Sequence, residues 1–64
     1  MKRGQIIEVM DAFENKILRR IVSFDANNVY VCRDEEYRAA SVENREPVSV
    51  GFGLQFVTRV LTEA

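Results

Sequence analysis

The chain has 64 residues, of which 47% are hydrophobic and 30% are charged, and its formal net charge is -1. This composition is that of an ordinary globular domain and excludes a disordered chain. The nearly balanced charge provides no overall field that would attract nucleic acid or an anionic membrane surface. A chain of this length is expected to form one small domain, residues 1–64.

Small domains often need a disulfide, a structural metal or a partner subunit to supplement a small core. Cys32 is the only cysteine and the sequence has no histidine, so we expect no intrachain disulfide, no zinc site and no cofactor. The core must then pack well by itself, or the chain must self-associate, for example as a homodimer. The unpaired cysteine favours the reducing cytoplasm, and no apolar run is long enough to be a signal peptide or to span a membrane.

Three strand-like runs fill the first half of the chain. Residues 5–11 come first, and the turn after them should place Asn15 in the left-handed conformation. Residues 16–24 are rich in β-branched side chains but alternate imperfectly, which predicts a bulge near Arg19 and Arg20 that keeps both guanidinium groups in water. A polar run at residues 25–28 predicts a hairpin turn into a third strand at residues 29–33.

The pattern changes after the third strand. Asp34 is suited to cap a helix, and the two acidic residues that follow it favour the positive end of the helix dipole. We predict a short helix at residues 35–43, with Asn44 as a left-handed stop and Pro47 preventing continuation. An irregular segment or a further hairpin arm is the alternative for this stretch.

Two strands complete the predicted domain. Residues 48–52 alternate cleanly, and residues 56–61 form the last strand after a break that one tight helical turn can occupy. The result is a mainly β fold, a small five-stranded SH3-like barrel with one short helix inserted between strands 3 and 4. The side chains expected to fill its core are Ile7, Val9, Ile21, Val29, Val31, Val48, Val50, Val57 and Val60, with Phe52 or Phe56 closing one end. An aspartate in place of Val50 should therefore unfold the domain.

Two stretches carry a resemblance. Residues 32–40 (CRDEEYRAA) and 45–52 (REPVSVGF) resemble short uncharacterised bacterial proteins of nearly this length that have an SH3-like small β-barrel. The shared pattern is a strand ending in Cys, an acidic helix start with Tyr, and Arg-Glu-Pro before a Gly-Phe strand. The resemblance implies a bacterial cytoplasmic protein, but it implies no activity and no site residue.

The residues that could carry out catalysis favour a structural interpretation. No histidine is present to activate Ser23, Ser41 or Ser49, and no glycine-rich phosphate loop occurs, so we expect that the protein is not an enzyme. Cys32 is interpreted as a packed apolar residue and not as a reactive thiol. The acidic residues 34–36 are interpreted as a helix start, since catalytic carboxylates need burial or close like charges.

Two functional hypotheses remain. The first is a non-enzymatic binding or scaffold module that acts through protein–protein contacts, with an unknown protein or a second copy as its partner, because some apolar strand residues cannot point inward. The second is a small-barrel single-stranded nucleic-acid binder that uses phosphate contacts and base stacking. Acidic residues are as abundant as basic ones, which favours the first. The candidate contact residues for either partner are Lys16, Arg19, Arg20, Tyr30 and Arg33. The apolar residues that motivate the first hypothesis are Ile6, Met10, Leu18 and Tyr30.

Overall fold

The computed structural model describes residues 1–61, in which one five-stranded sheet and one α-helix are the main elements. The strands are β1 (Ile6–Met10), β2 (Lys16–Phe24), β3 (Asn28–Cys32), β4 (Val50–Gly53) and β5 (Val57–Val60). The helix α1 (Asp34–Val42) lies between β3 and β4 in the chain, and one 3-10 turn, η1 (Leu54–Phe56), joins β4 to β5. The mainly β class and the helix inserted between the third and fourth strands are therefore confirmed.

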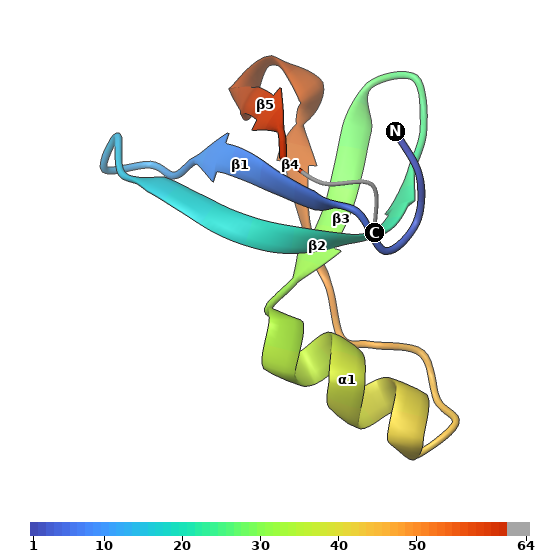
Figure 1. The fold of residues 1–64 in the computed structure, drawn as a ribbon. Coiled ribbons are helices and arrows are strands. Elements are labelled where there is room, and N and C mark those ends of the chain that lie inside the picture. Colours follow the sequence, from blue (N-terminus) through green and yellow to red (C-terminus); the bar gives the residue numbers. More distant parts are fainter. Residues whose placement is uncertain (62–64) are drawn as a thin grey trace.

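The strands form a single antiparallel sheet in the order β4-β3-β2-β1-β5 (Figure 1). The two edges, β4 and β5, do not pair with each other, so the sheet is not closed into a barrel. Because only η1 separates them in the chain, the two edges approach each other at that end. The helix α1 lies at the opposite end, beyond the point where β3 finishes (Figure 1).

The core lies on one face of the sheet. Its members have no exposed surface and occupy alternate positions on the strands, as the two-residue repeat of a strand requires. All of them were predicted from the sequence. They are Ile7, Val9, Ile21, Val29 and Val31. Four further side chains pack against this cluster while remaining partly exposed, namely Ile17, Phe52, Leu54 and Val57.

The prediction that Val48, Val50 and Val60 fill the core is wrong. Their exposed fractions are 76%, 59% and 47%. Val50 does pair with Val31 and so shares the core face, but no strand lies beyond β4 to cover it. Val50 and Val60 lie at the ends of β4 and β5 farthest from η1, where no pairing draws the two edges together. The core face is consequently open at the end of the sheet away from η1.

The predicted position of the bulge in β2 needs correction. The irregularity lies at Val22 and not at Arg19 and Arg20, because the pairing with β3 shifts between Ile21 and Ser23. The bulge falls where the consecutive residues Ile21 and Val22 are both buried.

The two turn residues predicted to be left-handed differ in outcome. In the β1–β2 turn the positive φ belongs to Glu14, at 65°, and not to Asn15. The Asp11 carboxylate explains this placement, because it accepts hydrogen bonds from the backbone N–H groups of Phe13 and Asn15. After α1 the positive φ does belong to Asn44, at 56°, so the predicted stop of the helix is confirmed.

The pairing of Val31 with Val50 gives a matched test of this exposure pattern. We expect Val31→Asp to prevent folding, because it places an unpaired charge at a position with no exposed surface. Val50→Asp should stay folded and lose only about 1 kcal/mol, roughly the range of strand propensities. Urea titration followed by far-UV circular dichroism measures both. If Val50→Asp is unfolded instead, the side chain of Val50 lies inside the core, as the sequence pattern predicts.

Candidate functional site

The position of α1 is fixed by Arg20. This residue pairs with Ile6 and Cys32, so its side chain lies on the face opposite the core. Its guanidinium donates to Asp34 Oδ1 at 2.8 Å and to the Gly4 carbonyl oxygen at 2.6 Å, and it lies 5.5 Å from the centre of the Tyr37 ring. Arg20 thus joins β2, the N-terminal segment and α1, and the prediction that its guanidinium stays in water is wrong.

The start of α1 also differs from the prediction. The helix begins at Asp34, and the N-cap position belongs to Arg33, whose side chain makes no capping hydrogen bond. Asp34 accepts from Arg20 and from Arg38, one helical turn later. Its carboxylate therefore ties the helix to the sheet, while its place in the first turn still suits the helix dipole.

The segment that returns from α1 to β4, residues 43–49, is held by Glu36. Arg45 donates to both carboxylate oxygens of Glu36, at 2.6 and 3.2 Å, and the Val48 backbone N–H donates to Oε2 at 2.8 Å. These hydrogen bonds, first from Arg45 and then from Val48, lower the pKa of Glu36 from its ordinary 4.5 to about 2. Pro47, which precedes Val48 in the chain, is buried.

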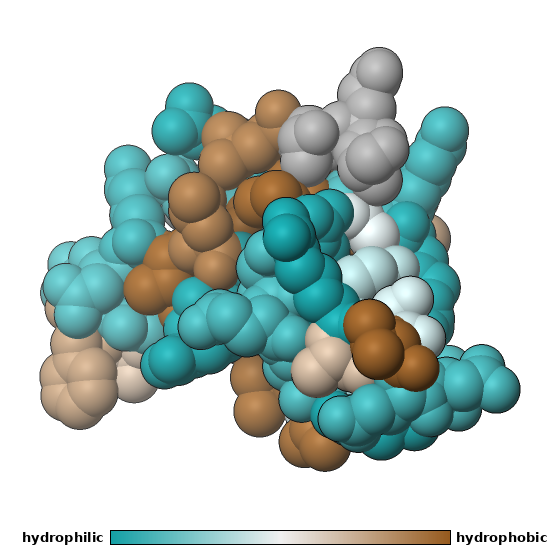
Figure 2. All heavy atoms as spheres, turned by 60° about the horizontal axis from the view of Figure 1, so that its bottom comes forward, coloured by the Kyte–Doolittle hydropathy of each residue, from teal (hydrophilic) through white to brown (hydrophobic). Residues whose placement is uncertain are grey.

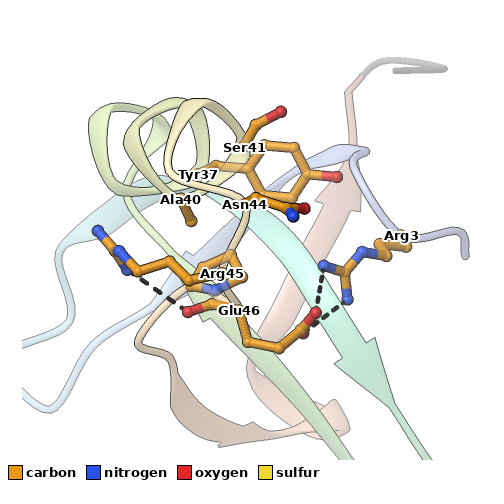
Figure 3. Close-up of a pocket in the computed structure, with 8 residues that line it drawn as sticks. Arg3, Tyr37, Ala40, Ser41, Asn44, Arg45 and Glu46 are labelled. Carbon is orange, nitrogen blue, oxygen red and sulfur yellow. Dashed lines mark hydrogen bonds and ion pairs between the residues drawn. The ribbon is translucent and has the colours of Figure 1, made fainter.

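A polar pocket opens on the other side of this segment (Figure 3). Arg3 reaches across from the N-terminal segment and pairs with Glu46 at 3.2 Å, while Arg45 also donates to the Glu46 carbonyl oxygen. Every charged side chain that lines this pocket among residues 1–61 is already ion-paired. We therefore interpret the pocket as part of the contacts that hold the return segment.

A second hollow, which we call the α1–β4 groove, has a volume of about 600 Å³. Its sides come from the first turns of α1 and from the segment that enters β4, and its floor is the open end of the core face. The residues that line it are Arg19, Val31, Cys32, Arg33, Glu35, Glu36, Ala39, Val48 and Val50. The exposed side chains of Val48 and Val50 thus project beside a concave surface of the molecule.

Apolar groups reach the surface elsewhere as well. Figure 2 shows brown, hydrophobic atoms interspersed with hydrophilic ones on the face that includes α1. Val42 on α1 and Phe13 at the β1–β2 turn are the most exposed large apolar residues, at 87% and 85%, and neither lines the α1–β4 groove. The groove differs from these single exposed residues because its two valines lie side by side in a concave site.

The charged residues of the groove are Arg19, Arg33, Glu35 and Glu36. Arg19 pairs with Ile7 in the sheet, so its side chain starts on the core face. Within residues 1–61, Arg19 and Arg33 have no carboxylate within ion-pair distance, and Arg19 donates only to the carbonyl oxygen of Leu18. The other arginines of this part of the chain are all ion-paired, namely Arg3, Arg20, Arg38, Arg45 and Arg59. Glu36 is neutralised by Arg45.

The structure brings together only two of the five contact residues predicted from the sequence, Arg19 and Arg33. Lys16 is exposed at the start of β2, and Arg20 is occupied by α1. Tyr30 alternates with buried residues of β3, so it lies on the opposite face, where its ring covers Gly51.

Sequence reasoning missed several groove residues, Val48, Ala39 and Glu36 among them. Val48 and Val50 carried only a weak signal, namely that β4 is short, as edge strands of native sheets often are. The role of Glu36 had no such signal, since its partners lie nine and twelve residues further along the chain.

Three of the apolar residues predicted to be half exposed lie on β1 and β2. Leu18 is exposed, and Ile6 and Met10 are intermediate on the neighbouring strand. Ile6 and Leu18 line a small hollow together with Arg19, Arg20 and Asp34, and neither Met10 nor Tyr30 lines it. Cys32 is buried, as predicted, and this burial raises the pKa of its thiol, so its surroundings do not favour a reactive thiolate.

The chain matches no family model, no curated protein and no solved structure at a significant level. Among residues 1–61, no helix has the length and apolar character needed to cross a membrane. The groove is therefore the observation on which a functional assignment has to rest.

The contacts of Glu36 predict how stability depends on pH. A carboxyl whose pKa is lowered by folding stabilises the fold above its unfolded pKa, and this stabilisation is lost as pH falls through the folded pKa. The stabilisation due to Glu36 should thus disappear between about pH 4.5 and about pH 2. Glu36→Gln should lower stability at pH 7 and flatten the decline in this range. Urea titrations from pH 7 to pH 2 measure the difference, and parallel curves for both proteins would show that Glu36 makes no such contribution.

Proposed function

We propose that the protein is a non-enzymatic binding or scaffold module that acts through protein contacts at the α1–β4 groove. The observation that carries this proposal is the pair Val48 and Val50, both more than half exposed and adjacent in a concave site. Because each valine is already partly covered, burying what remains exposed releases about 1 kcal/mol per side chain. A partner that covers both valines gains binding energy at a place where the free chain leaves them in water.

The walls of the groove are held in place by contacts within the chain, so a partner can bind without a large rearrangement of the backbone. Glu36 fixes the backbone at Val48 through a direct hydrogen bond, and Arg20 fixes α1 on the sheet. Side chains and loops that are already ordered lose little conformational freedom on association, which leaves more of the contact energy for affinity. The rigid support of the groove therefore favours a recognition role.

We further propose that the sheet is an SH3-like small barrel with an open seam between β4 and β5. The strand order, the antiparallel pairing of β5 with β1 and the 3-10 turn before β5 all support this relation. Small barrels of this kind present grooves to extended peptides, which is an argument from the fold alone. A bacterial cytoplasmic setting is proposed on the sequence resemblance and the single cysteine.

The nucleic-acid alternative has less support in this geometry. A strand-binding surface needs several cations and aromatic faces along one path. Here Arg20 is ion-paired, and Lys16 and Tyr30 do not line the groove.

Removal of the two groove valines tests the proposal directly. The tagged chain and its Val48→Ser/Val50→Ser variant are used to capture partners from cells that express the protein natively, with Val42→Ser as the control. Val42 is equally apolar and more exposed, but it lies outside the groove. We expect the partners retained by wild type and by the control to be lost from the double variant. Equal capture by all three proteins would contradict a role for the groove.

A further inference from the structure

The ion pairs of the described chain separate its arginines into two groups. Five are paired with carboxylates and serve to join elements, whereas Arg19 and Arg33 are not, within residues 1–61. Arg19 lies on β2 and Arg33 is the N-cap residue of α1, directly after β3, and both line the α1–β4 groove. The groove therefore combines two exposed valines with two guanidinium groups that have no carboxylate partner in the described residues.

Guanidinium groups bind carboxylates through paired, charge-assisted hydrogen bonds, which are stronger than neutral ones. Arg19 is partly buried, with Ile7 beside it in the sheet, so solvent screens its charge less than it screens a fully exposed charge. Glu35 lines the same groove but is not within ion-pair distance of Arg19 or Arg33, and Glu36 is paired with Arg45. The guanidinium groups of Arg19 and Arg33 thus leave a positive charge where β2 and the end of β3 meet the groove.

On this basis we infer that the α1–β4 groove binds a short segment of a partner protein in which apolar side chains flank a carboxylate. The apolar side chains cover Val48 and Val50, and the carboxylate bridges Arg19 and Arg33. This assignment rests on the proposed function and adds the chemical class of the ligand. A phosphate backbone, which carries a charge at every nucleotide, is disfavoured, because the groove offers two arginines beside two exposed valines and no continuous path of cations.

A displayed library of random ten-residue peptides is a suitable probe. We expect selection on the wild-type chain to enrich peptides that carry Asp or Glu between apolar residues. A selected peptide should bind about tenfold more weakly or worse when its acids are replaced by Asn or Gln, since a hydrogen bond to a charged group is typically worth that much. Fluorescence anisotropy of the labelled peptide, repeated at rising salt, measures the effect.

Charge-matched variants locate the contact. Arg19→Gln/Arg33→Gln should weaken the selected peptide about tenfold or more. Selection on Arg19→Glu/Arg33→Glu should enrich basic peptides in place of acidic ones. Lys2→Gln/Lys16→Gln lowers the net charge by two, as Arg19→Gln/Arg33→Gln does, at residues that do not line the groove, and should leave affinity nearly unchanged. If a double variant does not fold, Arg33→Gln alone serves the purpose, because the Arg33 side chain is exposed and makes no capping contact.

The remaining outcomes separate the two proposals. Enrichment of apolar peptides without acids, or equal binding by the glutamine variant, would overturn the carboxylate assignment and leave the protein-binding groove in place. Concentration-dependent dimerisation that Val48→Ser/Val50→Ser abolishes, seen by sedimentation, would assign the groove to a second copy instead. Binding of single-stranded oligonucleotides without any selected peptide, or no binding at all, would overturn both.

Discussion

The structure depends on one constraint, which is that a single sheet must bury its core face with no second layer above that face. The helix, which might have supplied that layer, lies beyond the end of β3 and is tied to the sheet by Arg20, whose side chain is on the opposite face. The sheet therefore encloses its core by bringing its edges toward each other at η1, where Phe52, Leu54 and Val57 complete the packing. At the other end nothing in the described chain performs this role, and the apolar face remains open.

The two neighbouring arginines of β2 show how strand alternation separates structural and recognition roles. Arg20 points away from the core and holds Asp34, the Gly4 carbonyl and the Tyr37 ring. Arg19, one residue earlier, starts from the core face and reaches the α1–β4 groove. Because consecutive side chains of a strand point to opposite faces, a single Arg-Arg pair can supply both the anchor of the helix and a charge for the groove.

Local patterns in the sequence were sufficient to predict most of the secondary structure and the centre of the core. Four of the five fully buried residues lie on β1 and β3, whose alternation is clear, and the stop of the helix at Asn44 follows from local capping preferences. The exposure of Val48, Val50 and Val60 could not be predicted in this way, because alternation gives the face of a side chain but not whether another strand covers that face. The contacts of Arg20 and Glu36 also depend on residues distant in sequence, so the separation of paired from unpaired arginines emerged only in three dimensions.

The position of α1 in the chain has a consequence for how such a domain can change over time. The helix interrupts what would otherwise be a plain hairpin between β3 and β4, and those two strands pair in register on either side of it. A segment placed there can be exchanged or lengthened without altering the path of the sheet. The exchange is restricted by Arg20, since any replacement must again present an anion to a guanidinium whose side chain is only 18% exposed. New specificities can therefore be grafted at this site, provided that each graft brings a carboxylate for the sheet.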